Sequence, residues 1–114
     1  MAVPKYDDFF NPLLRAIHEL GGSASIAEQE DKVTAILNLT DKDLAEIHRG
    51  STTKVHYRLA WARTYLKNYG LLENSARGIW ALTPEGLKTS IVDKKAVKRA
   101  VSKIRHVEPA PDDD

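Results

Sequence analysis

The sequence predicts a mainly α-helical domain with a small β hairpin, arranged as a winged helix-turn-helix. The prediction rests on a long amphipathic stretch at 53–69, on Gly70 as the residue that ends it, and on a hairpin pattern at 71–83. When residues are spaced by 100°, the apolar residues of the long stretch fall on one stripe, which is typical of a helix. This stripe consists of Val55, Leu59, Ala62, Leu66 and Tyr69.

Local signals mark the start of this helix and the hairpin that follows it. Thr52 or Thr53 can cap the first turn of the helix. The segments 71–74 and 79–82 are apolar enough for two strands, and the small residues and glycine between them suit a tight turn. A polar-faced helix followed directly by a hairpin with a basic tip is typical of the DNA-binding part of a winged helix.

Capping signals place the remaining helices. Ser25 and Glu28 form a capping box, and Thr40 with Asp43 repeats the pattern in a weaker form. Pro84 follows a threonine and suits the first position of a helix. From these signals and the apolar spacing, we expect helices at 6–20, 26–38, 41–48, 53–69 and 84–91.

The apolar positions of these elements define the expected core. In the last helix, 84–91, we expect Leu87 and Ile91 to point inward. The two acidic helices that precede the long helix are expected to support it. The expected core consists of Leu14, Ile17, Val33, Ile36, Leu44, Leu59, Ala62, Leu66, Leu72, Trp80 and Leu82.

The formal net charge of +1 conceals a strong segregation of charge along the chain. Residues 1–48 carry a net charge of −5, residues 49–106 a net charge of +10, and residues 107–114 a net charge of −4. A basic half joined to an acidic half indicates a polyanionic partner on one side of the fold. The simpler alternative is that these charges only solvate the surface.

The composition excludes several classes of protein. No apolar run approaches the ~18 residues of a membrane span, and no secretory signal opens the chain. Cysteine is absent, which removes disulfides and thiolate metal sites and fits an intracellular protein. We therefore expect a cytoplasmic protein with no membrane partner.

The sequence predicts no enzyme in this chain, no cofactor and no metal site. Glu30-Asp31-Lys32 matches the Glu-x-Lys half of a nuclease metal site by its letters alone. It lies on a predicted helix rather than on adjacent strands, so we interpret it as a solvated helix face. No other carboxylate or histidine cluster has ligand spacing, and no phosphate-binding glycine loop or nucleophile motif is present.

The predicted domain division falls after residue 92. Residues 1–92 account for the winged helix, and residues 93–114 form a basic segment with an acidic tail. The basic segment carries Val97, Val101 and Ile104 on one stripe, which is compatible with a further helix, either packed on the domain or only partly ordered. The tail has the composition of a linker to a further domain.

The run WARTYLKNYGLLENSARGIWALTPEG begins at Trp61 and is preceded by Pro12-Leu13-Leu14, the Gly21-Gly22 stop, a capped second helix and Arg49-Gly50-Ser51. With these motifs in this order, residues 4–90 resemble a known family, the N-terminal domain of Mrr-type restriction proteins, and the run from Trp61 carries most of the resemblance. The resemblance implies a winged-helix domain that binds double-stranded DNA, usually linked to a metal-dependent nuclease domain that cuts DNA with modified bases. That nuclease domain is absent from this sequence, so the resemblance implies no cleavage by this chain.

In a helix-turn-helix, the N-terminal half of the recognition helix reaches base edges in the major groove. An arginine at a hairpin tip can enter a minor groove or bind a phosphate. We interpret Trp61 and Arg63 as mainly structural, because matching positions of the family motif lie in the core. The predicted DNA contacts are Ser51, Thr52, Thr53, Lys54, His56, Tyr57, Arg58, Ala60 and Lys67 around the helix, with Asn74, Ser75 and Arg77 at the hairpin.

Two alternatives remain open from the sequence. The first is a winged helix used for protein contact, in which another protein covers the exposed arc of the long helix. The second is a dimeric transcriptional regulator, in which Val97, Val101 and Ile104 form the seam between two copies. A homodimer is therefore one of the partners that the sequence leaves open.

Overall fold

A computed structural model describes residues 3–104 of the chain. The predicted acidic tail, 107–114, lies outside the described residues. The elements are η1 (Tyr6–Phe9), α1 (Phe10–Glu19), β1 (Ser23–Ser25), α2 (Ile26–Leu37), α3 (Asp41–Ala45), β2 (Ile47–Arg49), β3 (Thr52–Thr53), α4 (Lys54–Asn68), β4 (Leu72–Ala76), β5 (Ile79–Leu82), α5 (Pro84–Lys88) and α6 (Lys94–Ser102).

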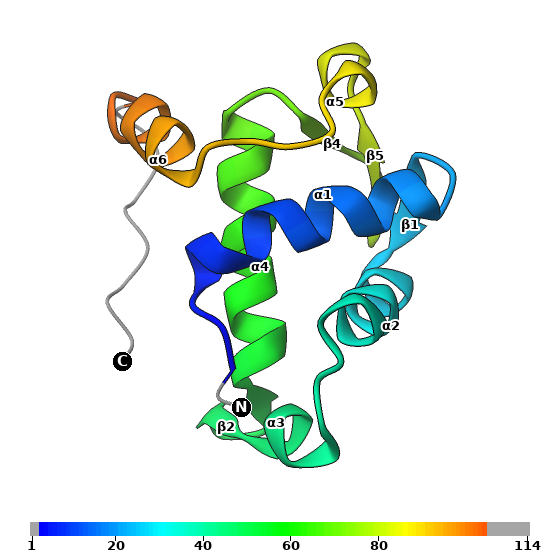
Figure 1. The fold of residues 1–114 in the computed structure, drawn as a ribbon, viewed down its shortest axis with the longest axis vertical. Helices are drawn as coiled ribbons and strands as arrows, with labels where there is room; N and C mark the ends of the chain where they lie inside the picture. Colours follow the sequence, from blue (N-terminus) through cyan, green and yellow to red (C-terminus); the bar gives the residue numbers. More distant parts are fainter. Residues whose placement is uncertain (1–2, 105–114) are drawn as a thin grey trace.

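The arrangement confirms the predicted fold class. Helix α1 crosses α4, while α3 and β2 lie at the N-terminal end of α4 and α6 lies beside its C-terminal half (Figure 1). The helices α2 and α4 form the helix-turn-helix pair, and β4 and β5 form the wing. Strands β1, β5 and β4 make one antiparallel sheet in that order.

Strand β1 is an element that the sequence does not predict. Its three residues are small, and neither their number nor their polarity gives a strand signal. The strand forms because it pairs with β5, where Ser23 lies opposite Ala81 and Ser25 lies opposite Ile79. This pairing joins the start of α2 to the wing, and the Ile26 amide donates to the Gly78 carbonyl at 3.2 Å.

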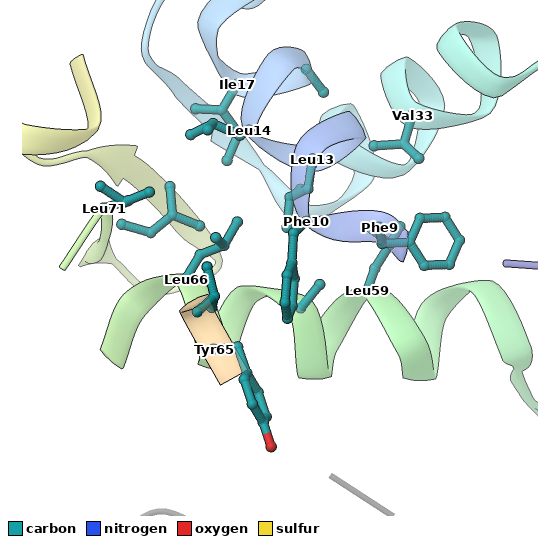
Figure 2. Packing of buried hydrophobic residues seen from close by; sticks show 14 of the residues in the cluster. Phe9, Phe10, Leu13, Leu14, Ile17, Val33, Leu59, Tyr65, Leu66 and Leu71 are labelled. Carbon is teal, nitrogen blue, oxygen red and sulfur yellow. The ribbon is translucent and has the colours of Figure 1, made fainter. Parts of the chain in front are cut away.

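The core lies between α1 and the buried stripe of α4. In Figure 2, Phe10, Leu13 and Leu14 of α1 face the side of α4 that carries Leu59 and Leu66. These residues are fully buried, and each apolar side chain of this size contributes about 1.5–3 kcal/mol when it leaves water. Eight residues of the predicted core are buried, and the other three pack against the core while partly exposed: Ile36, Leu44 and Trp80.

The predicted starts of α2, α3 and α4 are confirmed by their hydrogen bonds, whereas the first residues of the predicted helix 6–20 form the 3-10 helix η1, and α1 begins at Phe10. Ser25 with Glu28, and Thr40 with Asp43, form reciprocal capping boxes at α2 and α3. Thr53 caps α4, since its hydroxyl accepts from the His56 amide at 3.1 Å. The backbone hydrogen bond from Ser25 lowers the pKa of the Glu28 carboxyl, which is the expected effect of an amide donor on a carboxylate.

The predicted helix 41–48 is wrong beyond its first turns. Helix α3 ends at Ala45, because Glu46 takes an extended conformation and the chain then forms the two short strands β2 and β3. Gly50 makes the turn between them with a φ of +57°, which favours glycine. The capping box marked the start of the helix correctly, whereas no local signal marked its end.

The predicted helix 84–91 is also too long, and its two inward residues are wrong. Helix α5 ends at Lys88, and the side chains of Leu87 and Ile91 are 60% and 73% exposed. The residue that α5 buries is Gly86, whose Cα approaches the Leu71 carbonyl so closely that no side chain fits.

After α5 the chain runs extended along α1. His18 Nε2 lies 2.8 Å from the Thr89 carbonyl oxygen. Asn11 donates to the Val92 carbonyl at 2.9 Å and accepts from the Val92 amide at 2.7 Å. These contacts replace the hydrogen bonds that a longer α5 would have made.

Helix α6 belongs to the same packed unit as α4. Val97 and Val101 are fully buried in the common core. The side chains of Lys94 and Lys98 bind Asp8 and Asp7 at 2.6 and 2.9 Å, which ties α6 to the start of the domain. The predicted boundary after residue 92 is therefore crossed by core packing.

We predict that Gly86→Ala destabilises the domain by about 1–3 kcal/mol, the usual range for overpacking. An added Cβ would lie 2.1 Å from the Leu71 carbonyl oxygen, so α5 must move. Urea unfolding of the variant against wild type measures the loss. Lys88→Ala, at an exposed position of the same helix, is the control and should stay within about 0.5 kcal/mol. Equal stability of both variants would contradict the close approach.

We also predict that Val97→Ala lowers the free energy of unfolding by about 2 kcal/mol, because it removes two buried methyl groups and leaves a cavity. Lys95→Ala, on the exposed side of α6, should change it by less than about 0.5 kcal/mol. The unfolding transition should remain single. If the Val97 variant unfolds like wild type, α6 is not part of the cooperative core.

Candidate nucleic-acid interface

The arc of α4 opposite its buried stripe faces away from the core. Ser51, His56 and Lys67 are exposed along it, and Thr52, Thr53, Lys54, Tyr57 and Ala60 are partly exposed. The structure thus brings most of the predicted helix residues onto one surface. At its N-terminal end, a pocket of about 370 Å³ is lined by Glu30, Ser51, Thr52, Thr53 and His56.

Two carboxylates stand beside His56 and Lys54 at the start of α4. His56 Nδ1 lies 2.5 Å from Glu30 Oε2, and Lys54 Nζ lies 3.3 Å from Glu46 Oε1. Both pairs of side chains are partly exposed, so each contact contributes little to stability. The contacts nevertheless orient the imidazole and the ammonium group, and Glu46 offsets the positive charge of Lys54. No local sequence pattern predicts these pairings, because the partners lie on other elements.

Arg58 does not belong to this surface, which corrects its prediction as a DNA contact. Its side chain is buried, and its Nη1 donates to the carbonyl oxygens of Val3 and Pro4 at 2.9 and 3.1 Å. The guanidinium therefore holds the N-terminal segment against α4. An arginine has enough donors to satisfy backbone carbonyls inside a protein, which makes burial tolerable.

The structural interpretation of Arg63 is confirmed. Arg63 Nη1 donates to Gln29 Oε1 at 2.9 Å, and Gln29 Nε2 donates to the Ala24 carbonyl at 2.9 Å. All three residues are buried, so this chain of bonds links α4 through α2 to β1. Burial lowers the pKa of Arg63, with an opposing effect from the negative charge of Glu30. Trp61 packs partly buried against the core and meets Tyr65 edge-on.

The wing carries Arg77 at its exposed tip, as predicted. Asn74 is exposed, but its Nδ2 already donates to the Ala76 and Ile79 carbonyls at 2.7 and 2.8 Å. Both amide protons are therefore used to shape the tip, so the predicted DNA contact by Asn74 cannot be a hydrogen bond donated by its amide. Ser75 lies in the irregular part of the strand pairing, between Asn74 and Ala76, and is exposed.

The cations of residues 49–106 do not form one uniform positive surface. Arg58 and Arg63 point inward, and Lys54, Lys94 and Lys98 pair with carboxylates of the acidic half. The other cations of this segment in the described residues are without an ion pair there: Arg49, Lys67, Arg77, Lys88, Lys95, Arg99 and Lys103. The net charge of +10 on residues 49–106 therefore overstates the positive charge that a polyanion would contact.

One feature of this surface was missed by the sequence analysis. The imidazole of His48 on β2 stacks on the ring of Tyr57 on α4, with centroids 3.7 Å apart and planes 12° from parallel. The stack brings the β2–β3 hairpin next to the exposed arc of α4. The only hint of this stack in the sequence is that His48 and Tyr57 lie on either side of the predicted start of the long helix.

Other kinds of site are not seen in the described part of the chain. Among residues 3–104, no group of three or more histidines or carboxylates is placed to hold a metal ion. No helix there is long and apolar enough to cross a membrane.

A largely apolar cavity of about 610 Å³ lies on the outer side of α1, lined in part by Pro12, Ile36, Leu37 and Ile91.

Comparison with known proteins gives one family. The sequence profile of the Mrr N-terminal domain matches residues 6–90. A relative described as the type IV methyl-directed restriction enzyme EcoKMrr of Escherichia coli (strain K12) is 33% identical over 86 residues, which cover 75% of this chain and 28% of the relative. No solved structure matches the chain. The sequence profile and the identity agree, and the chain belongs to the family of Mrr N-terminal domains.

Proposed function

We propose that the chain is the DNA-binding module of an Mrr-type restriction system. In this proposal, α4 enters the major groove of double-stranded DNA and the wing tip at Arg77 contacts the backbone or the minor groove. Restriction acts on DNA inside the cell, so the module would work in the cytoplasm. Cleavage would come from a nuclease domain carried elsewhere in a longer protein.

One observation carries this proposal. The fold buries one side of α4 and leaves the opposite arc, with hydroxyls, an imidazole, a phenol and Lys67, facing outward beside a wing whose tip is an exposed arginine. Hydroxyl, imidazole and cationic donors bind phosphates and base edges. A helix with its side chains is about 10–12 Å across and the major groove is about 12 Å wide, so a helix such as α4, whose fifteen residues span about 22 Å, can lie in the groove.

The description of the relative suggests which DNA is bound. EcoKMrr is described as methyl-directed, and we propose that modified duplex is also the preferred partner of this chain. The residues at the front of α4 do not define a base by their chemistry, because threonine, histidine and tyrosine each serve several bases. The preference is therefore an experimental question, and methylated and unmethylated duplexes belong in every titration.

The dimeric regulator is disfavoured by the structure. Val97 and Val101, which would form its seam, are buried in the domain's own core and cannot pair two copies. The protein-contact alternative remains distinct, since it predicts binding that depends little on salt.

We predict that duplex binding weakens steeply with salt. About three to five phosphate contacts, among them Lys67 and Arg77, would give a slope of log affinity against log salt of about −2.7 to −4.5, at about 0.9 per phosphate. Fluorescence anisotropy of a labelled duplex between 50 and 200 mM salt measures the slope. A flat line would favour protein contact over DNA binding.

We predict different effects for two exposed positions. Tyr57→Ala should reduce discrimination between duplexes by about 1–3 kcal/mol, since a base contact is worth that much. Arg77→Ala should weaken binding to all duplexes by similar factors, because an arginine at the hairpin tip contacts mainly the phosphate backbone or responds to the width of the minor groove. Competition against a random duplex separates the two effects.

Two controls sharpen this test. Tyr57→Phe removes the hydroxyl but keeps the ring stacked on His48, so it separates hydrogen bonding from positioning. Arg15→Ala removes an arginine from the outer side of α1, away from the exposed arc of α4. If Arg15→Ala weakens binding as much as Arg77→Ala does, the contact surface has been placed on the wrong side of the domain.

A further inference from the structure

Residues 38–53 separate the two helices of the helix-turn-helix, a long connection for this motif, and contain the β2–β3 hairpin. The hairpin projects at the N-terminal end of α4 (Figure 1). Its turn residues Arg49, Gly50 and Ser51 are exposed, and the side chain of Ile47 is 50% exposed. Neither Ile47 nor Arg49 is part of the core.

The hairpin is held in one orientation relative to α4. The Lys54 amide donates to the Glu46 carbonyl at 2.9 Å, and the side chains of the same residues form an ion pair at 3.3 Å. Thr53 ends β3 and caps α4 at once, so no free joint separates the hairpin from the helix. The tip therefore has a fixed place at the start of the long helix.

A bulge directs the hairpin onto the exposed arc. Ile47 lies opposite Thr53 and Arg49 lies opposite Thr52, so His48 is an extra residue between them. Bulges redirect side chains, and this one places the His48 ring against Tyr57 at 3.7 Å. A connection that only joined two helices would need neither the bulge nor a ring stacked on a residue of the outer arc.

The chemistry of the tip fits an anionic backbone. Arg49 forms no ion pair with any residue of 3–104, and its guanidinium can donate two parallel hydrogen bonds to a phosphate. The exposed hydroxyl of Ser51 stands across the turn as a further donor. These groups stand where a duplex would flank the first turns of α4.

We infer that the β2–β3 hairpin is a further DNA-contacting element, in addition to α4 and the wing, in which Arg49 binds a backbone phosphate beside the groove that receives α4. His48 is a positioning residue that fixes the hairpin through its stack on Tyr57. This inference rests on the proposed function and adds residues to its contact surface.

The test compares two arginines that lose the same charge. Arg49→Gln should lower duplex affinity and reduce the salt slope by about 0.9, which makes the loss about 3.5-fold smaller at 200 mM than at 50 mM salt. Arg15→Gln, on the outer side of α1, should leave both quantities unchanged. Thermal unfolding of both variants establishes that they fold. An unchanged slope for Arg49→Gln, with wild type binding normally, would overturn this inference alone.

Substitution of His48 tests the positioning role. His48→Ala should weaken duplex binding, and His48→Phe, which keeps an aromatic ring against Tyr57, should restore most of it. Equal binding by both variants and wild type would show that the stack has no role in binding. Absence of duplex binding by the unsubstituted chain, even at 50 mM salt, would overturn the proposed function and this inference with it.

Discussion

The packing of α1 across α4 is the constraint on which the rest of the structure depends. Phe10, Leu13, Leu14 and Ile17 fill the space over the stripe of α4 that contains Leu59 and Leu66, and all six are fully buried. This contact fixes the rotation of α4 about its own axis. Because the stripe faces the core, the residues on the opposite arc of α4 face outward. The identity of the candidate interface is thus a consequence of how the core is filled.

The buried arginines extend the same constraint. Arg58 ties the N-terminal segment to α4, and Arg63 ties α4 to the start of α2 through Gln29. Each buried guanidinium needs several hydrogen-bond acceptors, which only one arrangement of the backbone supplies. Loss of the acceptor would leave a buried unpaired charge, which is far more costly than loss of an apolar contact of similar size. These residues therefore specify how the elements meet rather than what the surface binds.

Much of the fold could be predicted from the sequence because its signals are local. The stripe of α4, the capping boxes and the wing turn each involve residues close together in the chain, and all three are present in the structure, except that Tyr69 at the end of the predicted stripe is 37% exposed. Strand β1 and the segment after α5 could not be predicted, because distant partners define them: β5 for the strand, and His18 and Asn11 for the segment. The β2–β3 hairpin pairs residues that are close in the chain, but its two short strands carry no strand signal in the sequence. Helical phase placed Tyr57 outward correctly, but it put Arg58 at the flank of the surface, where only the position of Val3 and Pro4 shows that it is internal. The distribution of charge along the sequence predicted the surface least well, since cations such as Lys94 and Lys98 form ion pairs with Asp8 and Asp7.

The attachment of α6 has a mechanical consequence. Val97 and Val101 share the core with Leu66 of α4, while Lys94 and Lys98 grip the start of the domain. The orientation of α6 is therefore set by its packing against α4. A fluorophore on the outer face of α6, for instance at Lys95, would tumble with the whole domain instead of wobbling on its own. The polarisation of its fluorescence would report directly when the domain becomes part of a larger particle. Any domain joined rigidly to α6 would have a fixed orientation relative to α4.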